Sequence, residues 1–133
     1  MDVPRDFKPL FRSSPFLDLL GPFYYRENTE NFTIGIRVEE KHTNARGLAH
    51  GGLFMALADV ALGYSAAFSK DPPLKLVTTA LTTDFAGSAK IGDWLEAVVD
   101  VQKSGSRLVF ANSYISVGDE RVVRASASFL VAS

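Results

Sequence analysis

The sequence contains no cysteine, and this absence removes several kinds of chemistry. A chain without cysteine has no disulfide framework, no thiolate nucleophile and no cysteine-ligated metal. It has only two histidines, which argues against a histidine-rich metal site. We therefore expect no metal and no resident cofactor.

The chain also lacks an excess of charge of either sign. Its 14 Lys and Arg residues face 15 Asp and Glu residues, which gives a net charge of −1. Such a balance produces no field that would collect nucleic acid, so we expect no nucleic-acid partner. The first residues, MDVPRDFKP, lack the basic-then-apolar layout of a secretory signal. The resulting expectation is a cytoplasmic protein.

The chain has enough apolar residues for one folded domain. Of its 133 residues, 47% are hydrophobic and 22% are charged, both ordinary values for a globular protein. This length predicts a single domain over residues 1–133, large enough to bury a core.

The longest apolar run predicts a buried helix. Residues 53–68 read LFMALADVALGYSAAF, rich in good helix formers, with Asp59 as the only charge. The run is apolar on nearly every side, which is typical of a helix inside a fold. A membrane span is the alternative, but a central aspartate would cost about 2.5 to 3.5 kcal/mol there. Neither flank carries an anchor pattern, so we expect no membrane partner.

Alternation of apolar and polar residues predicts about six strands. Residues 32–38 alternate, and Phe23 to Tyr25 can pair with them across a turn at residues 27–31. Four further strands are expected after the helix, at residues 77–85, 94–101, 108–117 and 121–131. Because turn-prone residues join these four consecutively, we expect an antiparallel meander.

A short helix is predicted near the start of the chain. Ser14 suits its N-cap, Pro15 its first position and Gly21 a left-handed stop. The whole order predicts an α+β fold in which an antiparallel sheet wraps around one long central helix. One sheet cannot cover a helix that is apolar all round. We expect the remaining face, with Ala58, Ala61 and Gly63, to be covered by a second copy of the chain in a two-fold dimer.

The residues that can carry chemistry begin just before the central helix, at Asn44 and at His50-Gly51-Gly52. Consecutive glycines at a helix start leave backbone N–H groups bare at the positive end of the helix dipole. Such groups suit a phosphate, a carboxylate or a developing oxyanion. The alternative is a loop-to-helix turn that simply needs small residues.

Asp59 is a lone carboxylate in an apolar helix, where burial carries a desolvation penalty. It is either a structural group bonded by Ser or Thr hydroxyls, or a general base or nucleophile. His50 lies nine positions away, which is about 13 Å along the helix and on its opposite side. The two cannot meet one substrate atom within one chain. In a dimer with antiparallel central helices, His50 and Gly51 of one subunit would face Asp59 of its partner.

These residues resemble the hotdog-fold acyl-CoA thioesterases of the phenylacetic-acid-degradation type, within the 4-hydroxybenzoyl-CoA thioesterase-like superfamily. The resemblance rests on Asn44 and His50-Gly51-Gly52 before the long buried helix and on Asp59 within it, and it covers nearly the whole chain. It implies a hotdog fold and hydrolysis of acyl-CoA thioesters without a metal. It also implies a homodimer or a tetramer of two dimers.

The resemblance implies a role for each motif residue. Gly51 would polarise the thioester carbonyl through its N–H, and Asp59 of the other subunit would activate water or attack directly. Asn44 would help to hold water or the carbonyl, and His50 would position the thioester near its sulfur. Thr78 falls where the family has a hydroxyl facing the carboxylate, with Thr79 as a one-residue alternative.

A later turn resembles the segment of the family that contacts the nucleotide, and it comprises Lys103, Ser104, Gly105, Ser106 and Arg107. Its two cations would bind the phosphates of coenzyme A, although ordinary solvated turn charges are an equal alternative. His42 is expected to be a surface loop residue.

Two other functions fit parts of the sequence. One is a non-catalytic acyl-CoA-binding regulator, but the chain has no DNA-binding helix pair or basic extension and it retains Asp59. The other is a hydratase or dehydratase of the same fold, whose Asp/His pair is arranged differently from His50 and Asp59. The predicted function is therefore hydrolysis of aryl- or medium- to long-chain acyl-CoA to free acid and coenzyme A.

Overall fold

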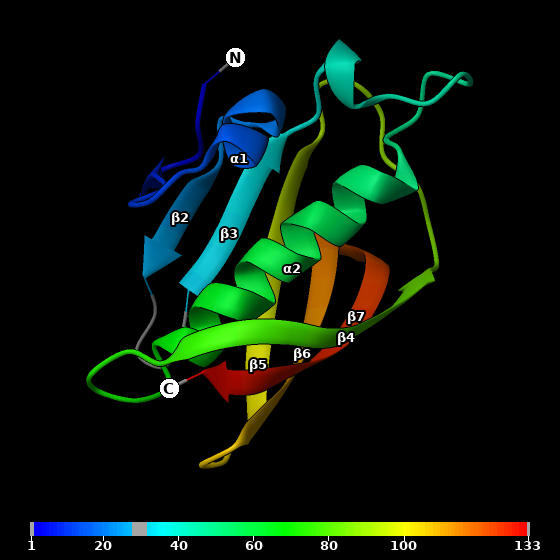
Figure 1. Ribbon diagram of the computed structural model, residues 1–133. Coiled ribbons are helices and arrows are strands. Elements are labelled where there is room, and N and C mark those ends of the chain that lie inside the picture. The colour runs from blue at the N-terminus through cyan, green and yellow to red at the C-terminus, as the bar shows by residue number, and fades with distance from the viewer. Residues whose placement is uncertain (1, 28–31, 133) are drawn as a thin grey trace.

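The computed structural model describes residues 2–27 and 32–132, and in this part of the chain one antiparallel sheet curves around one long helix (Figure 1). The helices are α1 (Pro15–Leu20), the 3-10 helix η1 (Glu40–His42) and α2 (Gly51–Ala67). The strands are β1 (Lys8–Pro9), β2 (Tyr24–Glu27), β3 (Phe32–Arg37), β4 (Lys75–Phe85), β5 (Trp94–Ser104), β6 (Leu108–Val117) and β7 (Glu120–Ala132). The predicted α+β architecture is confirmed, with the two-residue strand β1 as an addition.

The strands follow the order β1-β2-β3-β5-β6-β7-β4 across the sheet. The predicted meander is correct for β5 to β7, but it is wrong for β4, which pairs with β7 instead of β5. The cause is the connection at residues 86–93, which carries the chain across the fold so that β5 joins β3 (Figure 1). As a result, β4 is an edge strand whose second side has no partner strand among the described residues.

The predicted hairpin before α2 is present, because β2 pairs antiparallel with β3. β2 extends to Glu27, where the residue pattern predicts a turn instead. The other predicted turn residues, 28–31, lie outside the described residues.

α1 begins where the sequence predicts, since the Ser14 hydroxyl accepts a hydrogen bond from the Leu17 N–H at 3.2 Å. Its end differs from the prediction: Gly21 is extended (φ −63°, ψ −170°) and not left-handed. Glycine is still required there, because a Cβ would lie 2.9 Å from the Leu17 carbonyl oxygen. No residue of α1 is buried, and Phe16 and Leu19 are 61% and 73% exposed. This helix therefore rests on the surface of the fold.

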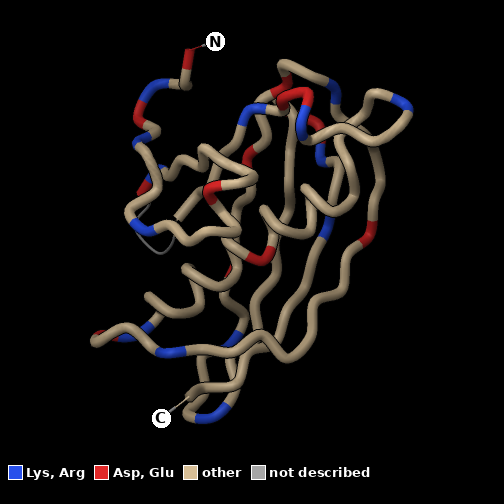
Figure 2. The backbone as a smooth tube through the Cα atoms, turned by 45° about the horizontal axis from the view of Figure 1, so that its top comes forward, with Lys and Arg blue, Asp and Glu red and all other residues tan. Residues whose placement is uncertain are grey.

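α2 buries one side against the sheet, with Leu57, Ala61 and Leu62 fully inaccessible. Ala58 is buried as well, so the prediction that Ala58 and Ala61 lie on an uncovered face is wrong. The uncovered face is real, but half-buried residues form it, namely Asp59, Val60, Gly63 and Tyr64. Charged residues are spread over the rest of the chain, whereas α2 carries only Asp59 (Figure 2). No helix within the described residues is long and apolar enough to cross a membrane.

Candidate active site

Asp59 and Thr78 are in direct contact on the uncovered face of α2. The Thr78 hydroxyl donates a hydrogen bond to Asp59 Oδ1 at 3.0 Å. The Thr79 hydroxyl lies instead against Ser128, 3.0 Å from its carbonyl oxygen and 2.9 Å from its hydroxyl. The two threonines differ because the register of β4 against β7 shifts between Thr78 and Ala80. The structure therefore brings Thr78, and not Thr79, to Asp59.

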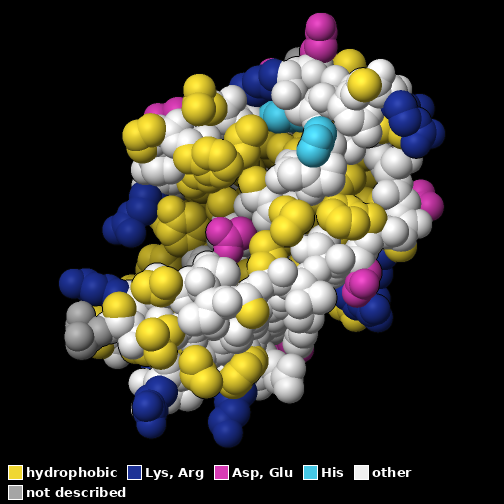
Figure 3. All heavy atoms as spheres, turned by 45° about the vertical axis from the view of Figure 1, so that its right-hand side comes forward, with side chains coloured by type: hydrophobic (Ala, Val, Ile, Leu, Met, Phe, Trp, Pro, Cys, Tyr) yellow, Lys and Arg dark blue, Asp and Glu magenta, His cyan; other side chains and the backbone are white. Residues whose placement is uncertain are grey.

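Asp59 is half-buried in the single chain, less than the apolar sequence around it predicts. The difference arises because α1 and β4 only border this face of α2 and leave it open to a cavity. A cavity of about 550 Å³ opens beside the carboxylate. Its wall is largely apolar and consists of Phe16, Leu17, Val60, Gly63, Tyr64, Ala67, Leu74, Leu76 and Phe129. Hydrophobic side chains gather on the face of the molecule shown in Figure 3.

Two cations also line this cavity, and sequence reasoning missed both. Arg12 precedes α1, and Lys75 begins β4. Neither lies in a motif, and only the tertiary fold brings them to the cavity that Asp59 also lines. No signal in the sequence connects these two residues.

The start of α2 presents a free backbone donor. His50 is the N-cap, and its Nδ1 accepts a hydrogen bond from the Gly52 N–H at 2.9 Å. In the neutral ring Nε2 then carries the proton and is the donor. The Gly51 N–H has no acceptor among the described residues. The Gly51 N–H therefore lies unbonded at the N-terminal end of the 17-residue helix α2, which is the positive end of the helix dipole.

Asn44 shapes the loop that leads into α2. Its Oδ1 accepts hydrogen bonds from the backbone N–H groups of Arg46 at 2.9 Å and Leu48 at 3.2 Å. Gly47 completes this turn with φ +79°, a conformation that favours glycine. Among the described residues the side-chain oxygen is engaged and nothing accepts from the amide nitrogen, so the nitrogen is the part of Asn44 that can meet a ligand.

Within one chain the predicted residues form two separate groups. One group is Asp59 with Thr78, and the other is Asn44, His50 and Gly51 at the start of α2. Gly51 and Asp59 are eight residues apart, about 12 Å along the helix. None of Asn44, His50 and Gly51 lines the cavity beside Asp59. A different cavity, of about 300 Å³, lies next to His50. A single chain therefore does not bring the two groups to one substrate.

The predicted nucleotide-contacting turn lies beside the C-terminal end of α2. The hydroxyls of Ser104 and Ser69 are 2.8 Å apart, and Lys70 Nζ donates to the Gly105 carbonyl at 3.2 Å. The Gly105 N–H donates to the Leu108 carbonyl at 2.9 Å, so it is not free to bind a phosphate.

The cations of this turn remain available. Lys103 and Arg107 are exposed, and no described residue pairs with either charged group. Ser106 is exposed between them. In one chain, however, the turn lies at the opposite end of α2 from Gly51.

His42 is buried, so the sequence prediction of a surface loop residue is wrong. Its side chain is 3% exposed and uses both ring nitrogens, one toward the Glu39 N–H and one toward the Leu20 carbonyl. A polar ring can be buried when its hydrogen bonds are satisfied in this way.

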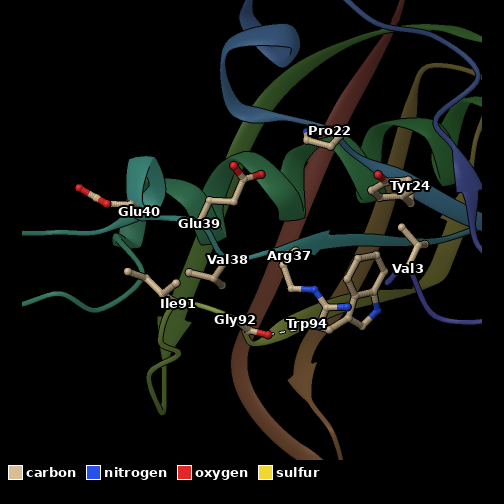
Figure 4. A pocket seen from close by; sticks show the side chains of 10 residues that line it. All are labelled: Val3, Pro22, Tyr24, Arg37, Val38, Glu39, Glu40, Ile91, Gly92 and Trp94. Atoms are coloured by element: carbon tan, nitrogen blue, oxygen red, sulfur yellow. Dashed lines mark hydrogen bonds between the residues drawn. The ribbon is translucent and has the colours of Figure 1, made fainter. Parts of the chain in front are cut away.

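A cavity away from these groups is shown in Figure 4 and has a volume of about 440 Å³. The Arg37 guanidinium donates to the Gly92 carbonyl at 3.2 Å and stacks over Trp94 at 5.1 Å. These contacts tie β3 to the loop before β5. No predicted site residue lines this cavity. Among the residues described, no cluster of three or more His, Asp and Glu could hold a metal ion.

The chain is similar to known proteins over most of its length. A family model described as the thioesterase superfamily matches residues 46–125. The Pseudomonas aeruginosa protein named "Putative esterase PA0474" is 50% identical over 130 residues, which is 97% of each chain. Acyl-coenzyme A thioesterase 13 of Mus musculus is 30% identical over 83 residues, which is 62% of this chain and 59% of that protein.

The fold is also found among solved structures. The E. coli PaaI protein, from the phenylacetic acid degradation operon, matches with a TM-score of 0.77 at 21% identity. The match covers 84% of this chain and 80% of that one. Together with the family model, this likeness confirms the predicted hotdog fold and the predicted family resemblance.

Proposed function

The chain belongs to the thioesterase superfamily and is a thioester hydrolase, and we propose that it converts acyl-coenzyme A to free acid and coenzyme A. The observation that carries this proposal is the hydrogen-bonded pair of Asp59 and Thr78 beside an apolar cavity of about 550 Å³. The mouse relative named acyl-coenzyme A thioesterase 13 supports this substrate class. The cavity has room for an aryl or a medium-chain acyl group next to the carboxylate.

The chemistry needs few groups, because a thiolate leaves readily. An oxyanion donor and one carboxylate are sufficient, without a metal or a cofactor. The Gly51 N–H polarises the thioester carbonyl. Thr78 holds Oδ1 of Asp59, which leaves Oδ2 to take a proton from water or to attack the carbonyl carbon. By either route the C–S bond breaks, coenzyme A leaves as the thiolate, and water supplies the new oxygen of the acid.

The proposed active unit is a homodimer in which the two α2 helices run antiparallel. Two observations support it. The face of α2 that carries Asp59 is uncovered, and β4 is an eleven-residue edge strand with Val77 and Phe85 55% and 51% exposed. A long exposed edge of this kind invites pairing with another chain. In such a dimer, each of two sites combines Gly51 of one copy with Asp59 of the other.

The far face of the sheet supports the further assembly of two dimers into a tetramer. On this face Val98, Phe110 and Leu130 are 46%, 40% and 47% exposed. Apolar side chains on three neighbouring strands offer a surface on which a second dimer can pack.

The remaining predicted residues complete the proposed site. His50 directs its Nε2–H toward the thioester sulfur, and the free amide nitrogen of Asn44 meets water or the carbonyl. Antiparallel helices bring the C-terminal end of one α2 toward Gly51 of the other copy. Lys103 and Arg107, in the 103–107 turn with Ser104, Gly105 and Ser106, then lie on the side where coenzyme A leaves the thioester. Their charges suit its phosphates.

A turnover assay tests the proposal. The purified protein is given phenylacetyl-CoA, 4-hydroxybenzoyl-CoA and octanoyl-CoA, and the release of free thiol is followed. We expect hydrolysis of at least one substrate and its loss in a folded Asp59→Asn variant. Tight binding of acyl-CoA without turnover would overturn the proposal and favour the non-catalytic acyl-CoA-binding regulator.

A further inference from the structure

His42 is buried beside the proposed site, yet it takes no part in the proposed reaction. Its Nδ1 accepts a hydrogen bond from the Glu39 N–H at 2.9 Å. The neutral ring therefore carries its proton on Nε2, which donates to the carbonyl of Leu20. One imidazole thus joins two segments through two different atoms.

The first segment leads to the oxyanion end of α2. His42 lies opposite His50 in a small hairpin, and its carbonyl accepts the His50 N–H at 2.8 Å. Farther along the same hairpin, Thr43 bridges to Ala49. The bond from Glu39 to Nδ1 closes η1, from which this hairpin starts. The position of the first residues of α2 therefore depends on how His42 is held.

The second segment is α1, which forms one wall of the cavity beside Asp59. Phe16 and Leu17 line that cavity, but no residue of α1 is buried. Its C-terminal end is held by the His42 ring on the Leu20 carbonyl and by Lys41 Nζ on the Gly21 carbonyl. A helix with so little buried surface depends on such ties for its position.

We infer that His42 is a positioning residue that keeps the acyl-pocket wall α1 and the Gly51 end of α2 in one arrangement. The inference rests on the proposed function, and it assigns a separate task to each ring nitrogen. Nε2 holds the wall and so affects acyl binding. Nδ1 holds the hairpin and so affects the reaction at the thioester.

Two substitutions separate these tasks. Asparagine places an oxygen where Nδ1 lies but does not reach Leu20, whereas glutamine reaches Leu20 but leaves the Glu39 N–H unpaired. We expect His42→Asn to raise KM for octanoyl-CoA roughly three- to tenfold with kcat nearly unchanged. We expect His42→Gln to lower kcat by a similar factor with KM nearly unchanged. Arg46→Gln, at the exposed tip of the same hairpin, is the matched control and should change neither constant.

A measurement without turnover keeps this inference separate from the proposed function. Affinity for an S-octyl coenzyme A thioether, which cannot be hydrolysed, should fall in His42→Asn and not in His42→Gln. If the wild-type protein binds the thioether but hydrolyses no acyl-CoA, the proposed function fails, and the two affinities still decide the role of His42 at the wall. Equal effects of the two variants on kcat, KM and affinity, or no effect of either, would overturn the inference. Thermal unfolding of each variant shows whether the fold is retained. If only one variant folds, that variant still tests the inference, because each is expected to change one constant, KM for His42→Asn or kcat for His42→Gln, and to leave the other unchanged.

Discussion

Replacing Thr78 by valine removes one hydroxyl and keeps the shape of the side chain, so it tests the contact with Asp59. The lost interaction is the 3.0 Å hydrogen bond from Thr78 Oγ1 to Asp59 Oδ1. A hydrogen bond to a charged group contributes about 1.5 to 3 kcal/mol. Because Thr78 is exposed and Asp59 half-buried in the single chain, the low end of this range applies. About 1.5 kcal/mol corresponds to roughly a tenfold loss of kcat/KM.

The neighbouring threonine supplies a matched control. Thr79→Val makes the same chemical change one residue later, but its hydroxyl bonds to Ser128 and not to Asp59. We therefore expect kcat/KM of Thr79→Val to stay within about twofold of wild type, because only a hydrogen bond away from the site is lost. Initial rates of thiol release from acyl-CoA give the comparison, and thermal unfolding shows that both variants are folded.

Two outcomes would contradict this role of the Thr78 hydroxyl. Wild-type rates in Thr78→Val would mean that its hydroxyl does not support the reactive carboxylate. Equal losses in both variants would mean that the strand, and not the contact with Asp59, is what the substitutions disturb.

Three further changes test the oxyanion donor, the 103–107 turn and the packing of the sheet. Gly51→Pro should lower kcat about 100- to 1,000-fold, because it removes one oxyanion donor at a first helical position where proline fits. Gly51→Ala keeps the N–H and is the control, and an unchanged rate in Gly51→Pro would contradict the assignment of Gly51 as the donor. Neutralising Lys103 and Arg107 together should raise KM for acyl-CoA with little change in kcat and should leave an acyl-pantetheine unaffected, whereas a lower kcat on both substrates would rule out a phosphate contact. Gly35→Ala should lower the free energy of unfolding in urea by about 1 to 3 kcal/mol through overpacking, because the added Cβ would collide with the Trp94 indole ring. An unchanged midpoint of urea unfolding would show that the indole ring moves aside.

Most of the fold could be predicted because its long elements carry clear periodicity. The helix expected over residues 53–68 is observed as Gly51–Ala67, and the alternating segments are strands. Strand order was only partly predictable, because β4 joins β7 through contacts distant in sequence. The strand Lys8–Pro9 is too short to show any alternation.

The site was less predictable where tertiary contacts decide the role of a residue. The choice between Thr78 and Thr79 depends on a bulge in β4 that no residue pattern reveals. His42 looks like a loop residue until folding brings the Leu20 carbonyl to its ring. Arg12 gave no signal either, because only the packing of α1 places it beside the cavity.

In the proposed dimer each active site is built from two copies of the chain, and complementation between two inactive variants tests this arrangement. Asp59→Asn removes the carboxylate, and Gly51→Pro removes the backbone donor. After mixing and subunit exchange, half of the dimers are mixed, and each holds one complete and one doubly defective site. About a quarter of wild-type activity should then return, as two-fold symmetry requires. If native mass spectrometry shows the mixed dimers and no activity returns, the site is not shared between subunits.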